Sequence, residues 1–182
     1  MTKTEPSCSE GATGARPVSR WLAASLAASA FVVPFAMSAS SVPAPTHPIT
    51  FAWYLSLGQP WFKPPDALVP LAWTCIEAGL VVAAYRLLRT PPSSARSRAL
   101  ALALLAWNIV AIGGWSRLFF GRRNIGGSVV AAAGMVATGA AFVQQAGAVE
   151  PASARAGVTF VAWVGFATLL TAAIWRLNGA RR

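Results

Sequence analysis

Residues 21–42 read WLAASLAASAFVVPFAMSASSV and contain no charged side chain. At a rise of about 1.5 Å per residue, a helix of this length covers the hydrocarbon core of a bilayer, which is roughly 30 Å thick. The stretch therefore predicts a membrane-spanning helix. Pro34 is tolerated inside it when neighbouring groups satisfy the backbone carbonyl that a proline leaves free.

Four further apolar stretches follow, and short arginine-containing segments flank them. We predict helices over residues 65–88, 99–116, 125–145 and 157–175. Pro64 and Pro65 suit the first turn of the second helix, where a missing N–H costs no hydrogen bond. The small residues of 125–145 favour close helix packing in lipid. The chain is therefore predicted to be an all-α membrane protein, a bundle of five transmembrane helices.

The other segments are assigned by their composition. Residues 1–20 are rich in Ser, Thr, Gly and charge and predict a disordered N-terminal tail. Residues 21–178 make the predicted transmembrane domain, and residues 179–182 a C-terminal tail. The connection between the first two helices is rich in proline, from Pro43 to Pro70, and predicts a stiff, extended loop.

The first stretch also resembles a secretory signal. Arg16 and Arg20 precede it, and Ser38-Ala39-Ser40 is similar to a small-residue cleavage site. Cleavage there would leave four membrane helices. With all five helices kept, the 15 Lys and Arg residues divide almost evenly between the two sides of the membrane. The positive-inside rule therefore leaves the orientation open.

The composition excludes several classes of protein. Hydrophobic residues make up 55% of the chain and charged residues 11%, with a mean hydropathy of +0.54; soluble domains carry about 25% charged residues. A net charge of +10 is typical of nucleic-acid binders, but here the basic residues lie between and beyond the apolar stretches. No nucleic-acid partner is predicted. His47 has no second His or Cys near it, so no metal site is predicted. Cys8 lies in the polar tail and Cys75 in an apolar stretch, so no intramolecular disulfide is predicted.

Polar residues fall near the middle of four predicted helices: Glu77, Asn108, Thr138 and Thr168. An acidic residue at that depth costs about 2.5–3.5 kcal/mol, so Glu77 is expected to face the bundle interior. Two interpretations stay open. Either a protonated Glu77 is hydrogen-bonded to Asn108 and links two helices, or Glu77 contacts a ligand or a proton.

The chain contains eight tryptophans. Most lie near predicted helix ends, where the indole prefers the headgroup level. Trp73, Trp107 and Trp163 lie deeper, and a deep indole needs a partner for its N–H or lines a cavity. We interpret these three as a candidate pocket for a flat aromatic ligand. The sequence has no Ser-His-Asp set, paired carboxylates or phosphate-binding glycine loop, so hydrolytic and phosphoryl chemistry are not predicted.

Short motifs from four regions follow one another along the chain. They are Trp53-Tyr54 with Gln59-Pro60, Phe62 and Pro64-Pro65; Trp73-Thr74; WS and LFFG at 115–116 and 118–121; and AWVGFA and IWRLN at 162–167 and 174–178. In this order they resemble the signature of the TspO/MBR family of tryptophan-rich sensory proteins. The resemblance covers about residues 21–178.

The resemblance implies a five-helix bundle, often a homodimer, whose interior pocket opens toward the first loop. It implies a tetrapyrrole ligand, protoporphyrin IX or haem, and no covalent cofactor. Trp73 and Trp163 match the family's pocket tryptophans, Pro60 and Phe62 belong to the loop that covers the pocket, and Trp53 and Tyr54 hold that loop. The candidate ligand-binding residues are therefore Trp53, Tyr54, Pro60, Phe62, Trp73, Glu77, Trp107, Asn108, Trp163 and Phe166.

The sequence departs from the family pattern at several positions. Thr159-Phe160 replaces a Pro-Tyr pair, Thr171 and Ile112 each replace an Asn, and Glu77 replaces a Tyr. We expect a sensor, carrier or regulator of porphyrin levels in a bacterial cell membrane. Two alternatives stay open. One is a light- and oxygen-dependent porphyrin-degrading enzyme that acts through Trp73 and Trp163; the other is a transporter with Glu77 as its proton site.

Overall fold

The computed structural model describes residues 18–91 and 95–179. Within these ranges the chain forms helices and no strand. In order they are α1 (Arg20–Ser38), α2 (Pro48–Ser56), α3 (Leu68–Arg89), α4 (Ala95–Ser116), the π-helical turn η1 (Arg117–Gly121), α5 (Ile125–Gly147) and α6 (Pro151–Asn178). Most of the predicted N-terminal tail, up to residue 17, lies outside the described residues, as do residues 180–182 of the predicted C-terminal tail.

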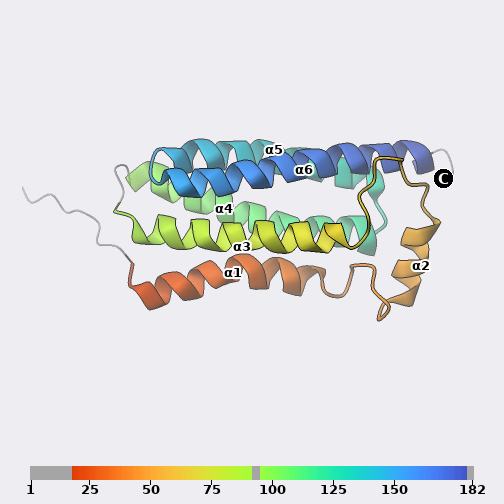
Figure 1. Cartoon of the computed structure of the whole chain (residues 1–182), viewed down its shortest axis with the longest axis horizontal. Helices are drawn as coiled ribbons and strands as arrows, with labels where there is room; N and C mark the ends of the chain where they lie inside the picture. Colours follow the sequence, from red (N-terminus) through yellow and green to blue (C-terminus); the bar gives the residue numbers. More distant parts are fainter. Residues whose placement is uncertain (1–17, 92–94, 180–182) are drawn as a thin grey trace, which may run out of the picture.

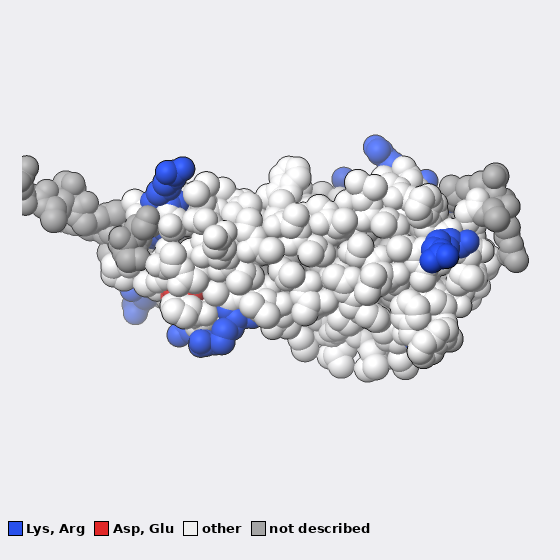
Figure 2. Space-filling view, turned by 90° about the horizontal axis from the view of Figure 1, so that it is seen from above, with Lys and Arg blue, Asp and Glu red and all other residues white. Residues whose placement is uncertain are grey.

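Five helices are long and apolar enough to cross a membrane: α1, α3, α4 together with η1, α5 and α6. They lie side by side in one elongated bundle (Figure 1). Lysine and arginine side chains gather at the two ends of the visible face, and the surface between them carries almost no charge (Figure 2). The chain is therefore a multi-pass integral membrane protein, as the apolar stretches predict.

The five spanning helices form a closed ring. α1 contacts α3 and α4, α3 contacts α6, α6 contacts α5, and α5 contacts α4. The ring is held at its ends by arginines that donate to backbone carbonyls: Arg89 to Val18 at 2.7 Å and Arg117 to Met37 at 2.8 Å. Because lipid supplies no hydrophobic force between helices, such bonds and close packing must hold the bundle together.

α1 enters the ring through a face of small side chains. Its buried residues are Ala23, Ala27, Ala30 and Pro34, which recur every three or four positions and so share one side of the helix. Alanine lets helix axes approach closely, which suits packing in lipid. The segment that resembles a secretory signal is thus one wall of the bundle.

Several predicted boundaries differ from the structure. α3 begins at Leu68, not at residue 65, so Pro64 and Pro65 lie in the loop before it and not in its first turn. α4 begins at Ala95, not at residue 99.

α1 ends at Ser38, not at residue 42, and the Ser38 hydroxyl donates to the Pro34 carbonyl at 2.7 Å. The loop predicted to be extended contains α2, which begins with Pro48 in the first turn and lies across the end of the bundle (Figure 1). Proline fixes a helical φ and needs no N–H partner there, so it starts this helix. α6 begins at Pro151 for the same reason, with Glu150 as its cap.

Candidate functional site

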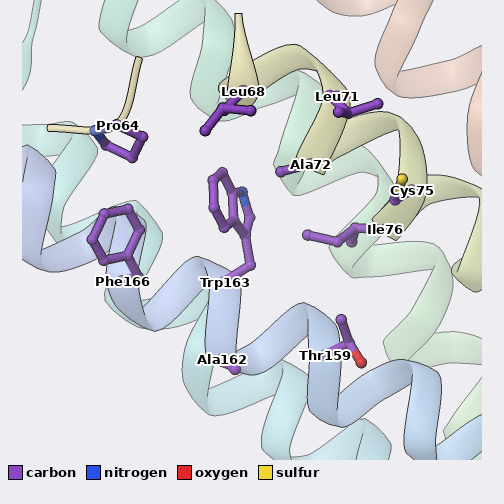
Figure 3. A pocket seen from close by; sticks show the side chains of 10 residues that line it. All are labelled: Pro64, Leu68, Leu71, Ala72, Cys75, Ile76, Thr159, Ala162, Trp163 and Phe166. Atoms are coloured by element: carbon purple, nitrogen blue, oxygen red, sulfur yellow. The ribbon is translucent and has the colours of Figure 1, made fainter. Parts of the chain in front are cut away.

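A groove of about 770 Å³ lies between α3 and α6 (Figure 3). It is in the half of the bundle nearest α2, and Figure 1 shows α2 at the end of the bundle. Small-molecule sites in proteins have volumes of roughly 300–1,000 Å³. The described residues that line the groove include no charged side chain. They are Pro64, Leu68, Leu71, Ala72, Cys75, Ile76, Thr159, Ala162, Trp163 and Phe166.

The groove exists because α3 and α6 meet at one end and separate toward the other. Away from α2, the Ser153 hydroxyl of α6 donates to the Ala83 carbonyl of α3 at 3.1 Å. Nearby, a Cβ added to Gly79 would lie 3.8 Å from the Cβ of Ala156. Closer to α2, the large rings of Trp163 and Phe166 stand on α6 between the two helices (Figure 3).

Trp163 is the central side chain of the groove. Its ring projects from α6 toward Leu68 of α3 (Figure 3) and meets Trp73 edge to face, with 6.3 Å between ring centroids. Its Nε1 atom is buried and has no hydrogen-bond partner among the described residues. A buried indole N–H normally finds an acceptor, so this one is free to donate to a ligand.

The loop of residues 57–67, here called the α2–α3 loop, covers the end of the groove that faces the aqueous side. Phe62 packs edge to face on Phe166, with 6.4 Å between ring centroids. Asn178, at the end of α6, accepts from the Gly58 N–H at 2.9 Å and donates to the Gly58 carbonyl at 3.0 Å. The same amide also donates to the Ile174 carbonyl. Asn178 thereby fixes the loop to the helix.

A polar cluster fixes the other end of the α2–α3 loop. Lys63 forms an ion pair with Asp66, and the Tyr54 hydroxyl donates to Asp66 at 3.3 Å. Burial raises the pKa of the Tyr54 phenol above its ordinary value, although the Lys63 charge opposes this. Burial also opposes the charge of Lys63, but its interactions with Asp66 and Tyr54 outweigh burial and raise the pKa of the ammonium group. The Lys63 ammonium group therefore stays protonated over the physiological range.

Trp53 and Tyr54 lie in a separate aromatic cluster beside η1. Trp53 packs on Phe119 and Tyr54 on Phe120, with centroid separations of 5.8 Å and 5.9 Å. Trp115 stacks on Phe119 and donates its indole N–H to the Ser128 carbonyl. These rings anchor α2 to the end of α4. They support the α2–α3 loop without lining the groove.

Among the predicted ligand-binding residues, Trp163 and Phe166 line the groove. Trp107, Asn108 and Glu77 lie away from it. Trp107 is 61% exposed on the outer side of α4, so it faces the surroundings of the bundle. Asn108, its neighbour, is buried and accepts from the Thr138 hydroxyl of α5 at 2.9 Å. Asn108 therefore pairs with α5 and not with Glu77.

The Glu77 side chain is half-buried and makes no hydrogen bond with any described residue. Arg98 of α4 donates to the Leu88 carbonyl of α3, so these two residues lie at the same level of the bundle. Measured along each helix from that level, Glu77 and Asn108 lie at nearly the same depth in the membrane. Their rotations differ. Gly79 faces α6, and Glu77 lies about 200° around α3 from Gly79, on the side away from the groove. The prediction paired the two residues because they lie at the same depth. In the structure they are apart because they point in different directions around their helices.

Several groove residues were not singled out from the sequence as site residues. Five of them lie in one apolar stretch whose residues look alike in the sequence, and only their common face on α3 distinguishes them. They are Leu68, Leu71, Ala72, Cys75 and Ile76. Asn178 belongs to one of the sequence motifs, but the motif does not predict its hydrogen bond with the Gly58 backbone. Among the described residues no group of three His, Cys, Asp or Glu side chains is placed to hold a metal ion.

Comparison with known proteins agrees with this architecture. The sequence model of the TspO/MBR family matches residues 25–176. The chain belongs to the TspO/MBR family. The match spans all five membrane helices, and its relatives come from mammals and bacteria.

The chain is 29% identical to the translocator protein of Sus scrofa over 71% of its own length and 77% of that protein. It is 32% identical to the tryptophan-rich sensory protein of Cereibacter sphaeroides over 65% of this chain and 70% of the relative. Protein CrtK of Rhodobacter capsulatus is 29% identical over 70% and 79% of the two chains. TspO/MBR membership thus confirms the resemblance seen in the motifs.

Proposed function

We propose that this TspO/MBR protein binds a tetrapyrrole, protoporphyrin IX or haem, in the groove between α3 and α6, and acts as a sensor, carrier or regulator of porphyrin levels. The observation that carries the proposal is Trp163 in the groove of about 770 Å³. Its ring meets Trp73 edge to face, and its buried N–H has no acceptor among the described residues. Family membership supports the ligand class, and this geometry supports the place.

The groove suits the two chemical parts of a porphyrin. Its wall of aliphatic and aromatic side chains fits the flat macrocycle, which gains by contact with Trp163 and Phe166. The carboxylates need cations. At the α2 end of the groove, Lys63 directly precedes the lining residue Pro64, and Arg176 is exposed on α6. The ligand would therefore lie with its carboxylates toward α2.

Titration of protoporphyrin IX into the purified protein tests this proposal, with tryptophan fluorescence and the porphyrin absorbance band as two readouts. We expect saturable quenching by the wild type. Trp163→Ala should weaken binding by about 2 kcal/mol or more, close to thirtyfold, because it removes both ring contact and hydrogen bond. Trp107→Ala is the matched control, since it removes an indole outside the groove. Equal loss in both variants, or no quenching in the wild type, contradicts the proposal.

The homodimer implied by the family resemblance and the bacterial cell membrane as location stay predictions. So do the two alternative functions, porphyrin breakdown and proton-coupled transport through Glu77.

A further inference from the structure

The α2–α3 loop closes the groove at the aqueous end of the bundle. Asn178 makes two hydrogen bonds with the backbone of Gly58, at 2.9 and 3.0 Å. Phe62 covers Phe166, and Lys63 is paired with Asp66. A ligand that entered from water through this end would have to break these contacts together.

The groove is open on its other side, toward the surroundings of the bundle. Leu68 is 50% exposed and Leu71 is 59% exposed, and Cys75 and Ala162 are also exposed where the groove meets the surface. All four lie on helices that span the membrane, so this mouth faces hydrocarbon. Its rim is apolar, and passage through it breaks none of the contacts that hold the α2–α3 loop.

We propose that the ligand enters the groove sideways from the bilayer, between α3 and α6, while the α2–α3 loop stays closed. The proposal rests on the proposed function and narrows its ligand class. The ligand is a flat molecule already dissolved in the membrane. Its uncharged edge enters the groove first, because the described lining holds no charged group. The ligand also carries a hydrogen-bond acceptor for the Trp163 N–H.

A disulfide that locks the loop tests this route directly. A Cβ added to Gly58 would lie 3.5 Å from the Cβ of Leu177, and disulfides join Cβ atoms about 3.5–4.5 Å apart. Gly58→Cys with Leu177→Cys, made in a Cys8→Ser, Cys75→Ala background, is therefore placed to bond the loop to α6. The same protein, reduced and oxidised, is its own control. The readout is the association rate of protoporphyrin IX with protein in phosphatidylcholine vesicles.

A second variant narrows the mouth in the bilayer. Ala162→Trp adds a large ring on α6 where the groove opens, and Leu169→Trp adds the same ring at a position on α6 that is 67% exposed and outside the groove. We expect Ala162→Trp to slow association about tenfold, which corresponds to about 1.4 kcal/mol in the barrier. Leu169→Trp should keep the wild-type rate.

The results of these rate measurements distinguish the entry route from the binding site. With entry from the bilayer, the oxidised loop disulfide leaves the association rate within about twofold of the reduced protein, a barrier change of about 0.4 kcal/mol. A large slowing by the disulfide, with Ala162→Trp at the wild-type rate, overturns the lateral route and leaves porphyrin binding in place. If the reduced protein does not bind porphyrin at all, the proposed function itself fails.

Discussion

The two sides of α6 pack in opposite ways. Toward α5, a Cβ on Gly139 would lie 2.8 Å from a Val161 methyl group, and a Cβ on Gly157 would lie 2.8 Å from the Phe142 ring. No side chain larger than hydrogen fits at either position. Toward α3, the same helix is held off by Trp163 and leaves a groove of about 770 Å³.

The difference shows how one helix both seals and opens a bundle in lipid. On the α5 side, glycines admit the rings of Phe142 and Phe160, each 1% exposed, deep between the helices. Ring and glycine interlock, so contact is continuous. On the α3 side, aromatic residues face Ala72 and Ile76 without any such recess, and space remains. The sealed side gives rigidity to the wall from which Trp163 projects.

Gly157→Val is the substitution expected to damage the sealed side most. The new side chain overlaps the Phe142 ring and Val143, which are themselves packed. Overpacking of this kind costs about 3 kcal/mol. Thermal unfolding in detergent, followed by loss of helical circular dichroism, should show a clearly lower midpoint. Gly165→Ala is the control, because no described atom lies within 4 Å of the added Cβ. Equal stability of the two variants would refute the account of the sealed side.

Glu77→Leu tests the face of α3 that points away from α6 and from the groove. An acidic side chain in mid-membrane costs about 2.5–3.5 kcal/mol, and Glu77 has no partner among the described residues to offset this. We expect the variant to be more stable by about 2 kcal/mol in the same unfolding assay. Porphyrin affinity should stay unchanged because Glu77 faces away from the groove. A loss of affinity would return Glu77 to the ligand site.

Trp163→Phe sharpens the comparison on the open side. The variant keeps a ring against Trp73 and removes the unpartnered N–H. Porphyrin affinity should fall about fivefold, since one hydrogen bond contributes about 1 kcal/mol. The unfolding midpoint should stay the same or rise, because the protein no longer buries an unsatisfied donor. A variant that binds as tightly as wild type would show that the ligand does not use this N–H.

Glu150 caps the first turn of α6, where the contacts with α3 begin, and gives the smallest expected effect. Burial opposes its charge, but hydrogen bonds from Ser153, together with the positive charge of nearby Arg86, outweigh burial and lower the pKa of its carboxyl below the ordinary value. A group with a lowered pKa in the folded state stabilises above its ordinary pKa and loses that contribution as pH falls through the folded value. The unfolding midpoint should therefore drop on acidification below about pH 4.5. Glu150→Ala should remove about 1 kcal/mol at neutral pH and flatten the acid dependence.

Much of the architecture followed from the sequence. Length and hydropathy predicted all five spans, because a span needs only enough consecutive apolar residues to cross the hydrocarbon. The sequence grouped Trp73 with Trp163, by depth and by the family motifs, and the two rings contact each other in the structure. Trp107 was placed at a suitable depth and yet faces outward. α2 was missed because the prolines around it read as an extended loop.

The sequence by itself determined the number, order and depth of the membrane helices and the family to which they belong. Only the tertiary structure decided which way each helix turns, and hence that Asn108 meets Thr138, Glu77 faces away from α6, and Trp163 stands in the groove. The physical reason is that lipid is as apolar as the interior of the bundle. The inward and outward faces of a spanning helix therefore carry the same kinds of residue, and small differences in packing choose between them.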